Sequence, residues 1–423
     1  MEDLPNILIR KTAFSLPFTE ITRLCRTSKQ FNQAICHFQQ FWYDKLVLDY
    51  GITEKFSERL NWRKIYIHYL YRLIGLGSNR LGQLGLGQIA EADELTEIPT
   101  VVVKDIACGF NHTIVIDAGG NLWGAGGNVN GQLGSNTEER EVINFVKLTY
   151  NSKFIQVACG YPHTLALSED NRIWVIGSNM LGEIGLGRIR DAHKFTELKG
   201  YRAKQISCGE RHSAFIDLNG NLYTFGDNHD GQLGRDGDNA IPNKVLIPGN
   251  VPVIQVSCGV AHTACIDANN DIWVFGSSSY GKLGLGMRKY WAKRPINISN
   301  HKAKFVSCGN FHTGFIDLED HVWTFGDNGT NQLGLQGIKS SFDPTKITQV
   351  YDGGQIMNRD FRVKQVYCSR DITSFIDLEN NLWVAGNDER LNINSEVPAM
   401  IPRIKANKVA TGDDYMVVIG YFN

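Results

Sequence analysis

The chain repeats one pattern of residues at a nearly constant interval. Its first full copy begins Cys108-Gly109-Phe110-Asn111-His112-Thr113, continues through an apolar stretch to Asp117, and closes with Gly131-Gln132-Leu133-Gly134. The Cys-Gly pair that opens the pattern recurs at Cys159, Cys208, Cys258 and Cys308. A period of roughly 50 residues indicates one supersecondary unit that is copied and packed against its neighbours. We therefore expect the recurring residues to build the fold and the departures from the pattern to carry function.

One copy of the pattern has the character of a four-stranded β-sheet. Residues 205–208 alternate in polarity and end at a glycine, and residues 213–217 and 221–226 form two further short apolar runs. Asn219-Gly220 between these runs is typical of a type I′ hairpin turn. The copy lacks the 3.6-residue period of a helix. Short strands joined by tight turns and repeated in this way predict an all-β propeller, with one blade of four antiparallel strands per copy.

The copies can be counted from each half of the pattern. The Cys-Gly half appears five times in full and twice in degenerate form, at Cys368-Ser369 and Thr411-Gly412. The half that ends in Gly-x-x-Gly also appears seven times, first at residues 77–85 and last, in degenerate form, at Gly386-Asn387. Because the first back half has no front half and the last front half has no back half, residues 408–421 should complete the blade begun at 73–87. We predict a seven-bladed β-propeller closed by its C-terminal strands.

The composition is that of a folded protein without a marked charge. The chain has 423 residues, 42% of them apolar, and a formal net charge of −1. It therefore lacks the basic surface expected for binding nucleic acid or an anionic membrane. It has no apolar run long enough for a transmembrane helix and no secretion signal at its start. Six of the nine cysteines share one repeat position, too far apart for disulfides, which favours a reducing compartment, the cytosol or nucleus.

The repeat resembles that of the regulator of chromosome condensation family. The matching elements are His-Thr, Ile-Asp, Asn-Leu-Trp and Gly-Gln-Leu-Gly, in this order, and they extend over residues 71–423. The resemblance implies a seven-bladed propeller. It weakens near the C-terminus, where Ile372 replaces the histidine and residues 388–391 replace Gly-Gln-Leu-Gly.

The first 70 residues differ from the repeat in composition and spacing, with Gly51 as their one glycine. Pro5 and Pro17 are suited to begin helices, and Ser28 is a suitable N-cap for a third. Apolar residues at helical spacing include Ile21, Leu24, Cys25, Phe31, Ala34, Ile35, Trp62, Ile65, Tyr66 and Tyr69. We predict a small all-α domain at residues 1–51, a connecting helix at 52–70 and the propeller at 71–423.

The helical stretch resembles an F-box. The matching residues lie within residues 2–51 and include Leu4-Pro5, Leu16-Pro17, Thr27-Ser28-Lys29 and Phe41-Trp42. An F-box binds the Skp-type adaptor of a cullin ubiquitin ligase through exposed apolar residues of its first helices. Carried over to this chain, the resemblance implicates six residues in adaptor binding: Leu4, Pro5, Ile7, Leu8, Leu16 and Pro17.

The recurring histidines are better explained by structure than by metal binding. They are His112, His163, His212, His262 and His312. One histidine per blade at the same radius keeps the five apart, whereas a zinc site needs four ligands within about 2.3 Å of one ion. We predict that each is buried and hydrogen-bonded to a neighbouring strand. The aspartates that end the second strand should accept backbone N–H bonds in the hairpin turn that follows.

No residue pattern indicates catalysis or a cofactor. The nearest approach to a phosphate-binding loop is Gly281-Lys282, but Leu283 follows where a Walker loop has serine or threonine. The chain also lacks a Gly-x-Ser-x-Gly elbow and a Cys-x-x-Cys pair. We predict that the protein is not an enzyme and needs no metal or cofactor.

Two departures from the repeat are candidate contacts for a protein target. Residues 289–294 form a basic and aromatic patch between blades, which fits either a binding face or a solvated loop. The interval from Cys308 to Cys368 is longer than the others, so a longer loop should leave the ring there. We assign target binding to four residues: Tyr290, Trp291, Arg294 and Asp352.

Three functions fit these observations. The first is a non-enzymatic substrate-recognition subunit of a Skp-cullin-F-box ubiquitin ligase, with the Skp-type adaptor, a cullin and a target protein as partners. The second is a guanine-nucleotide exchange factor for a small GTPase, like the founding member of the family. The third is a plain interaction scaffold. The regular spacing of the early blades disfavours an exchange wedge, and an F-box followed by a repeat domain favours the first function.

Overall fold

The chain divides into two compact units, residues 1–72 with 421–423, and residues 73–420. The computed structural model describes residues 9–10, 13–14, 16, 21, 23–25, 28–50, 63, 71–100, 102–134, 139–148, 150–188, 191–287 and 289–422. No helix of this described part is both long and apolar enough to cross a membrane.

The first unit is helical where it is described. It contains α3 (Lys29–Phe31), the π-helical turn η1 (Asn32–Cys36) and α4 (Gln39–Tyr50). The hydroxyl oxygen of Ser28 accepts a hydrogen bond of 3.2 Å from the N–H of Phe31, which satisfies one of the free donors at the start of α3. The predicted role of Ser28 as an N-cap is confirmed.

A small apolar core stabilises this unit. Ile21, Ile35 and Trp42 are fully buried in it, and the Trp42 ring packs edge-on against Phe41 with ring centroids 5.2 Å apart. Cys25 is disulfide-bonded, which the sequence did not indicate. Pro5, where a helix is predicted to begin, and the apolar residues predicted to form a face between positions 62 and 69 lie outside the described residues.

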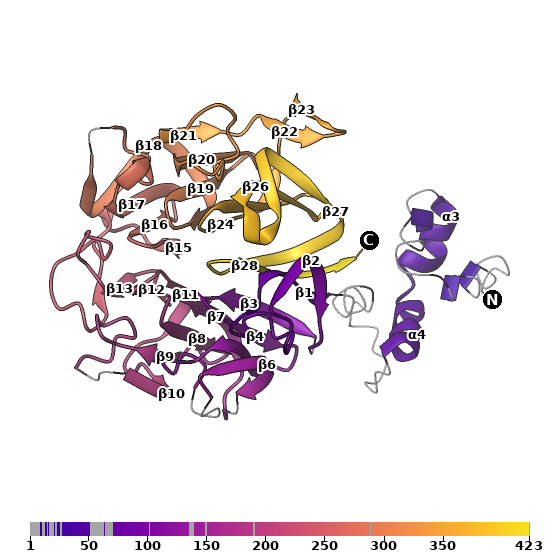
Figure 1. The fold of residues 1–423 in the computed structure, drawn as a ribbon, viewed down its shortest axis with the longest axis horizontal. Helices are drawn as coiled ribbons and strands as arrows, with labels where there is room; N and C mark the ends of the chain where they lie inside the picture. Colours follow the sequence, from indigo (N-terminus) through magenta and orange to yellow (C-terminus); the bar gives the residue numbers. More distant parts are fainter. Residues whose placement is uncertain are drawn as a thin grey trace. The chain divides into compact units, whose positions relative to one another are not determined.

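The second unit is a ring of antiparallel sheets. Figure 1 shows the strands following one another around the ring, and the indigo first strand lies beside the yellow last one. The described strands form five sheets, and β18 (Trp291–Cys308) and β27 (Ile393–Thr411) each continue from one blade into the next. Counted in this way, the described part of the ring contains seven four-stranded blades, as the sequence predicts.

Each blade has an inner strand that ends at the Cys-Gly position. The inner strands are β3 (Val103–Cys108), β7 (Phe154–Cys159), β11 (Ala203–Cys208), β15 (Val253–Cys258), the second half of β18, β24 (Val363–Cys368) and the second half of β27. The second strands are β4 (His112–Asp117), β8 (His163–Ser168), β12 (His212–Asp217), β16 (His262–Asp267), β19 (His312–Asp317), β25 (Ile372–Asp377) and β28 (Tyr415–Phe422). In this order the strands define blades 1 to 7.

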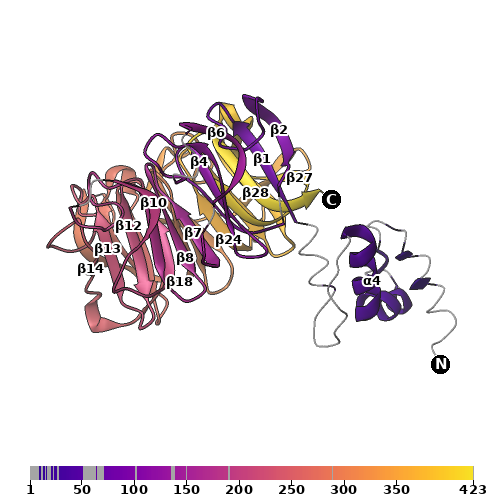
Figure 2. The same ribbon diagram turned by 90° about the horizontal axis from the view of Figure 1, so that it is seen from below.

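The remaining strands complete the blades on the outside. The third strands are β5 (Leu122–Gly127), β9 (Ile173–Ser178), β13 (Leu222–Gly226), β17 (Asp271–Ser277), β20 (Val322–Asp327), β26 (Asn381–Asp388) and β1 (Arg72–Ser78). The outer strands are β6 (Glu141–Leu148), β10 (Asp191–Glu197), β14 (Asn243–Lys244), the first half of β18, β21 (Ser340–Lys346), the first half of β27 and β2 (Glu91–Ile98). Figure 2 shows β12 and β13 side by side within one blade. Three 3-10 turns lie between strands: η2 (Pro248–Asn250), η3 (Ser279–Gly281) and η4 (Glu389–Leu391).

Blade 7 joins the two ends of the repeat region. Strand β28 lies between β27 and β1 in the sheet, and the N–H of Ser78 in β1 donates to the carbonyl of Asp414 at 3.0 Å. In addition, the Lys408 ammonium forms an ion pair with Asp105 of blade 1. Pairing the two ends removes the free sheet edges that an open array would expose.

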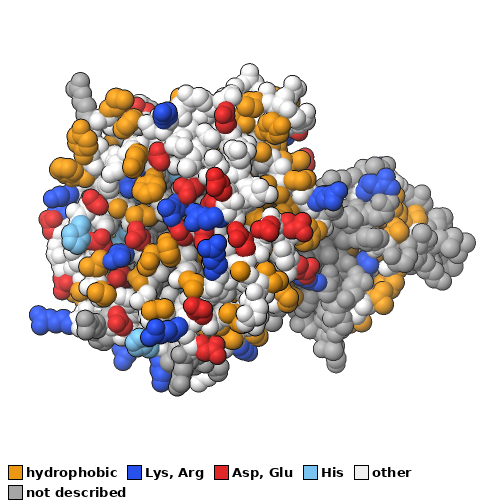
Figure 3. Space-filling model, in the orientation of Figure 1, with side chains coloured by type: hydrophobic (Ala, Val, Ile, Leu, Met, Phe, Trp, Pro, Cys, Tyr) orange, Lys and Arg blue, Asp and Glu red, His pale blue; other side chains and the backbone are white. Residues whose placement is uncertain are grey.

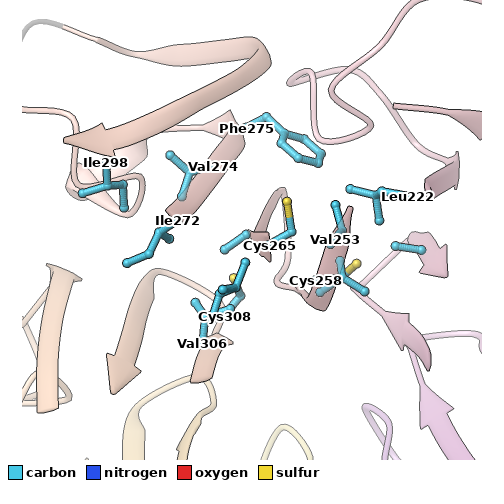
Figure 4. Packing of buried hydrophobic residues seen from close by; sticks show 14 of the residues in the cluster. Leu222, Val253, Cys258, Cys265, Ile272, Val274, Phe275, Ile298, Val306 and Cys308 are labelled. Atoms are coloured by element: carbon cyan, nitrogen blue, oxygen red, sulfur yellow. The ribbon is translucent and has the colours of Figure 1, made fainter. Parts of the chain in front are cut away.

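The core lies between neighbouring blades. Figure 4 shows buried side chains of blades 3, 4 and 5 converging, among them Leu222, Phe275 and Val306. All three are at most 1% exposed. Because each blade buries apolar side chains against the next blade, the ring depends on the hydrophobic contact between copies rather than on any one sheet.

The long interval before blade 6 contains the predicted longer connection, and it is folded as a β-hairpin, which the sequence did not indicate. Strands β22 (Gln349–Asp352) and β23 (Gln355–Asn358) pair with each other, and Tyr351 bridges to Ala399 of β27. The turn consists of Gly353 and Gly354, both at positive φ. The hairpin uses N–H and C=O groups that the outer strand of blade 6 would otherwise leave unpaired.

Candidate protein-binding face

The loops that carry the repeat motif lie at one end of every blade. In blade 3, His212 at the start of the second strand pairs with Gly226 at the end of the third strand. The Cys-Gly loop before His212 and the Gly-x-x-Gly turn after Gly226 therefore share one end of the blade. We call this end of the seven blades the motif face.

Two glycines show why the motif needs this residue. A Cβ atom on Gly209 would lie 2.3 Å from the carbonyl oxygen of Gly259 in the next blade. A Cβ atom on Gly226 would lie 2.6 Å from the carbonyl oxygen of Arg211, and Gly226 has a φ of +107°. Both positions therefore exclude other residues, the first by close contact between blades and the second also by backbone conformation.

At the opposite end, the repeat aspartates stabilise the hairpin turns. In blade 1, Asp117 accepts a bond of 2.8 Å from the N–H of Asn121 and one of 3.0 Å from Nε1–H of Trp123. Burial alone would raise the pKa of Asp117, but the hydrogen bonds from Asn121 and Trp123 outweigh it and lower the pKa. The predicted structural role of these aspartates is confirmed.

Each repeat histidine joins its blade to the next. Nε2 of His112 lies 2.9 Å from Oγ1 of Thr164, and Nε2 of His163 lies 2.8 Å from Oγ of Ser213. The same contact to the next blade is made by His212, His262 and His312. All five rings are fully buried. The prediction of buried histidines bonded to neighbouring strands is confirmed.

The hydroxyl partner fixes the protonation of these histidines. Thr164 donates its proton to the carbonyl of Gln132 at 3.0 Å, so it can only accept from Nε2–H of His112. Nδ1 of His112 then carries a lone pair and has no hydrogen-bond partner. Burial lowers the pKa of His112 and His163 to about 3 and that of His212 to about 4. The imidazoles are therefore neutral structural groups rather than acids or bases.

Two blades replace the histidine, and each replacement keeps the contact in another form. In blade 6, Ile372 stands at the histidine position, and in blade 7 Met416 stands at the position of the hydroxyl partner. Both are buried in one apolar cluster. In blade 7, Tyr415 stands at the histidine position. Its hydroxyl donates to the carbonyl of His112 at 2.6 Å, and Oγ1 of Thr113 lies 3.2 Å from this hydroxyl. The Tyr415 contact links the last blade to the first.

A central cavity of about 320 Å³ lies at the motif face, lined by the Cys-Gly loops of all seven blades. Its thiols are free but unreactive, since burial raises the pKa of Cys108 and Cys308 to about 12. Within the described ranges, no group of three His, Cys, Asp or Glu side chains is placed to hold a metal. The cavity wall therefore offers surface for binding but no activated nucleophile.

Departures from the repeat in blades 6 and 7 form one charged cluster on the motif face. Nη1 of Arg370 lies 2.7 Å from Oδ1 of Asp413, and its Nε lies 3.4 Å from Oδ2 of Asp371. Arg390 lies 3.4 Å from Asp388 and 3.8 Å from both Asp371 and Asp413. The propeller face in view in Figure 3 shows acidic and basic side chains intermingled near its centre. Both arginines are about 40% exposed and remain accessible to a polar partner.

Aromatic side chains border the cavity in the other blades. Phe110 and Tyr161, which follow the Cys-Gly pairs of blades 1 and 2, have ring centroids 4.3 Å apart. The guanidinium of Arg211 lies 5.8 Å from the Tyr161 ring. In blades 4 and 5, Tyr280 packs edge-on against Phe311 at 5.7 Å. Exposed aromatic groups beside charged groups are typical of protein-binding surfaces.

Three of the residues assigned to target binding lie together. Tyr290 and Trp291 are 74% and 61% exposed, with ring centroids 6.5 Å apart. Trp291 pairs with Ser277 at the end of β17, which places it at the outer edge of the motif face. Arg294, on the same strand, forms an ion pair with Asp236 of blade 3. The aromatic pair is thus freely accessible on blade 4.

Asp352 does not join this group. It ends strand β22 of the hairpin beside blade 6, and its carboxylate lies 3.7 Å from Nη1 of Arg359. The hairpin follows β21, whose last residue, Lys346, pairs with Trp323 near the start of β20. Strand β21 therefore ends on the side of its blade that is opposite to the motif face. Asp352 comes six residues later, beside blade 6, whereas Trp291 lies on blade 4.

Of the residues assigned to adaptor binding, the structure describes one. Leu16 is half-buried and packs against the core of the helical unit. Leu4, Pro5, Ile7, Leu8 and Pro17 lie outside the described residues.

The sequence reasoning missed Arg370, Arg390 and Lys282 as members of the motif face. Each stands at a fixed repeat position where other blades have another residue. Aligning the blades position by position would have found them. Their convergence, however, depends on how the loops of different blades meet around the cavity.

The fold and the face define a propeller protein that presents aromatic and charged loops around a central cavity. The profile of the RCC1-like domain matches residues 72–418. The protein belongs to this family.

Known relatives and solved structures share the sequence or the fold of this propeller. Human HERC4, a probable E3 ubiquitin-protein ligase, is 32% identical over 183 residues, which are 41% of this chain and 17% of HERC4. The match thus spans less than a fifth of that relative. The structure of human WBSCR16 has a TM-score of 0.74 at 22% identity, covering 82% of this chain and 99% of WBSCR16.

Prp20p from Saccharomyces cerevisiae has a TM-score of 0.73 at 18% identity, covering 87% of this chain and 97% of Prp20p. At these identities the two solved structures support the fold alone. Taken together, the family and its members indicate a protein-binding role for the propeller.

Proposed function

We propose that the protein is a non-enzymatic substrate-recognition subunit of a Skp-cullin-F-box ubiquitin ligase. The observation that carries this proposal is the pairing of two compact units, a helical one with its own apolar core and a propeller with an exposed binding face. In this proposal the helical unit binds the Skp-type adaptor, and the motif face holds the target protein.

The helical unit supports the adaptor-binding half of the proposal. A unit of this size has a small core, and domains with small cores gain stability from a partner. Leu16, which the F-box resemblance implicates in the contact, is half-buried rather than fully enclosed. It can therefore contribute both to the core and to a bound adaptor.

The propeller supports the target-binding half. Tyr290 and Trp291 present a large, rigid and exposed aromatic surface, and such residues dominate the energy of protein interfaces. The charged cluster around Arg370 lies on the same face and supplies polar contacts. The catalytic step of ubiquitin transfer is left to the ligase partners, in line with the inert cavity of this propeller.

Adaptor binding can be tested with purified Skp-type adaptor and variants of the full-length protein. Leu16→Asp combined with Pro17→Asp should abolish capture of the adaptor, because a buried interface does not accept unpaired charges. The matched control is Leu48→Asp, since Leu48 is 62% exposed on α4 of the same unit. Equal capture by the wild-type protein and the double variant would sink the F-box assignment. A small GTPase bound by the propeller, with no adaptor captured, would favour nucleotide exchange instead.

A further inference from the structure

The motif face contains an almost fully buried lysine whose ammonium makes no hydrogen bond or ion pair with the described residues. Lys282 occupies the second position of the Gly-x-x-Gly turn in blade 4. The residue is only 2% exposed, and within the described part of the protein its Nζ has no hydrogen-bond or ion-pair acceptor. A charge that is largely removed from water and forms no ion pair is costly, and an anionic ligand would offset this cost.

The same position has a structural role in five other blades. Glutamine stands there as Gln83, Gln132, Gln232 and Gln332. In each case the side-chain oxygen accepts a bond of 2.9–3.0 Å from the N–H two residues earlier. Glu183 of blade 2 does the same at 2.8 Å. An ammonium can only donate, so Lys282 cannot close its turn in this way.

The turn of blade 4 differs accordingly. Tyr280, the residue two positions before Lys282, has a φ of +61° in the left-handed region, unlike the corresponding residues of the five other blades. This conformation leaves the Tyr280 side chain 56% exposed and in edge contact with Phe311. Blade 4 has therefore exchanged a turn-closing residue for a cation and an exposed aromatic ring.

The surroundings of Lys282 form one side of the cavity mouth. Its Nζ lies 5.7 Å from the centroid of the Phe311 ring, and Phe311 lines the central cavity. Asp230, Glu210 and the thiol of Cys308 act on the ammonium at a distance, while burial lowers its pKa. His262 also faces it and is held neutral by burial. The ammonium thus lies over the Phe311 ring, and no carboxylate of the described residues forms an ion pair with it.

We propose that Lys282 anchors a carboxylate group of a bound peptide at the mouth of the cavity. A carboxylate placed against this ammonium would make a charge-assisted hydrogen bond in surroundings of low polarity, where such bonds are strong. The exposed ring of Tyr280, two residues before Lys282, would contact the residues beside the carboxylate. Two acidic groups near a single cation disfavour a doubly charged phosphate, so a singly charged carboxylate fits better.

This inference rests on the proposed role of the propeller in target binding but not on adaptor binding. It makes the target an acidic segment, whose carboxylate comes either from an Asp or Glu side group or from the free C-terminus of the target. A library of random peptides with free C-termini, panned against the full-length protein, provides the probe. Each enriched peptide is then synthesised in three forms: unchanged, with its acidic side chains replaced by amides, and with an amidated C-terminus.

The test variant is Lys282→Gln, which restores the residue that four other blades carry and should therefore fold. The matched control is Glu183→Gln, the same type of change at the same position of blade 2. We expect one of the two neutralised peptide forms to bind the wild-type protein roughly tenfold more weakly or worse. We expect Lys282→Gln to lose affinity by a similar factor and to become insensitive to that neutralisation, while Glu183→Gln binds like the wild type.

The proposal is overturned if no peptide is enriched, if binding does not depend on a carboxylate, or if Lys282→Gln binds as tightly as the wild type. Tighter binding of phosphorylated peptides would also overturn it. The outcome is independent of the adaptor experiment. Carboxylate binding without adaptor capture leaves this site standing and removes the F-box proposal, and the converse result removes only this site.

Discussion

The five interblade histidines should make the propeller sensitive to mild acid. In the folded ring each imidazole is neutral, because burial lowers the pKa of His112, His163 and His312 to about 3, that of His212 to about 4, and that of His262 well below its usual value. In the unfolded protein the same groups titrate near pH 6.5. Between these values the unfolded state binds more protons than the folded state, so stability falls as the pH falls.

The size of the effect follows from the unfolded pKa. Between pH 7 and pH 5 an unfolded histidine becomes almost fully protonated while the buried one stays neutral, which costs about 2 kcal/mol per histidine. Five histidines together approach the whole stability of a typical folded domain, about 5–15 kcal/mol. Glu183 and Asp371 act in the opposite direction, because burial raises the pKa of each carboxyl and the folded state takes up protons there.

Urea unfolding at a series of pH values between 7 and 5, followed by tryptophan fluorescence, measures this loss. The expected result is a steep fall in the unfolding midpoint through this range. The matched variant is His163→Ile with Ser213→Met, which copies the apolar residues that blades 6 and 7 carry at these positions, Ile372 and Met416. It should reduce the pH dependence by about one proton, whatever its stability at pH 7. A midpoint that stays level from pH 7 to pH 5, or an equal slope in both proteins, would refute the reasoning.

Three further predictions concern closure, the interblade bonds and the target surface. Deleting residues 405–423 removes β28 and the Lys408–Asp105 ion pair, so calorimetry should show a lower and broader transition; an unchanged melting profile would contradict closure through blade 7. Thr164→Val leaves Nε2–H of His112 buried without an acceptor and should cost about 1–3 kcal/mol in urea unfolding. The control Thr96→Val alters an exposed hydroxyl and should cost little, and equal losses in the two variants would count against the bond. Tyr290→Ala with Trp291→Ala should weaken target binding without lowering the melting temperature, since both rings are exposed; a large drop in melting temperature would show that they are structural.

Much of the ring could be predicted because the information is local and repeated. Strand lengths and the recurring glycines depend on a few neighbouring residues, and copies at a constant interval can only pack against one another. The same argument placed the histidines and aspartates in structural roles, and their hydrogen bonds bear this out. The type I′ turn expected at Asn219-Gly220 was wrong, because only Gly220 has a positive φ. The hairpin of β22 and β23 escaped prediction because its strands are four residues each and pair with β27, which lies far along the sequence.

The sequence by itself determined the number of blades, the strands of each copy and the positions at which copies differ. Only the tertiary structure decided what those differences do. Arg370 meets Asp413, 43 residues away, because the inner loops of blades 6 and 7 converge at the cavity. Lys282 looks like an ordinary turn residue until its side chain is seen buried, with the ammonium over the Phe311 ring and no ion pair. Burial, partner and charge depend on residues that the closed ring brings together from distant parts of the sequence, and a linear pattern does not record them.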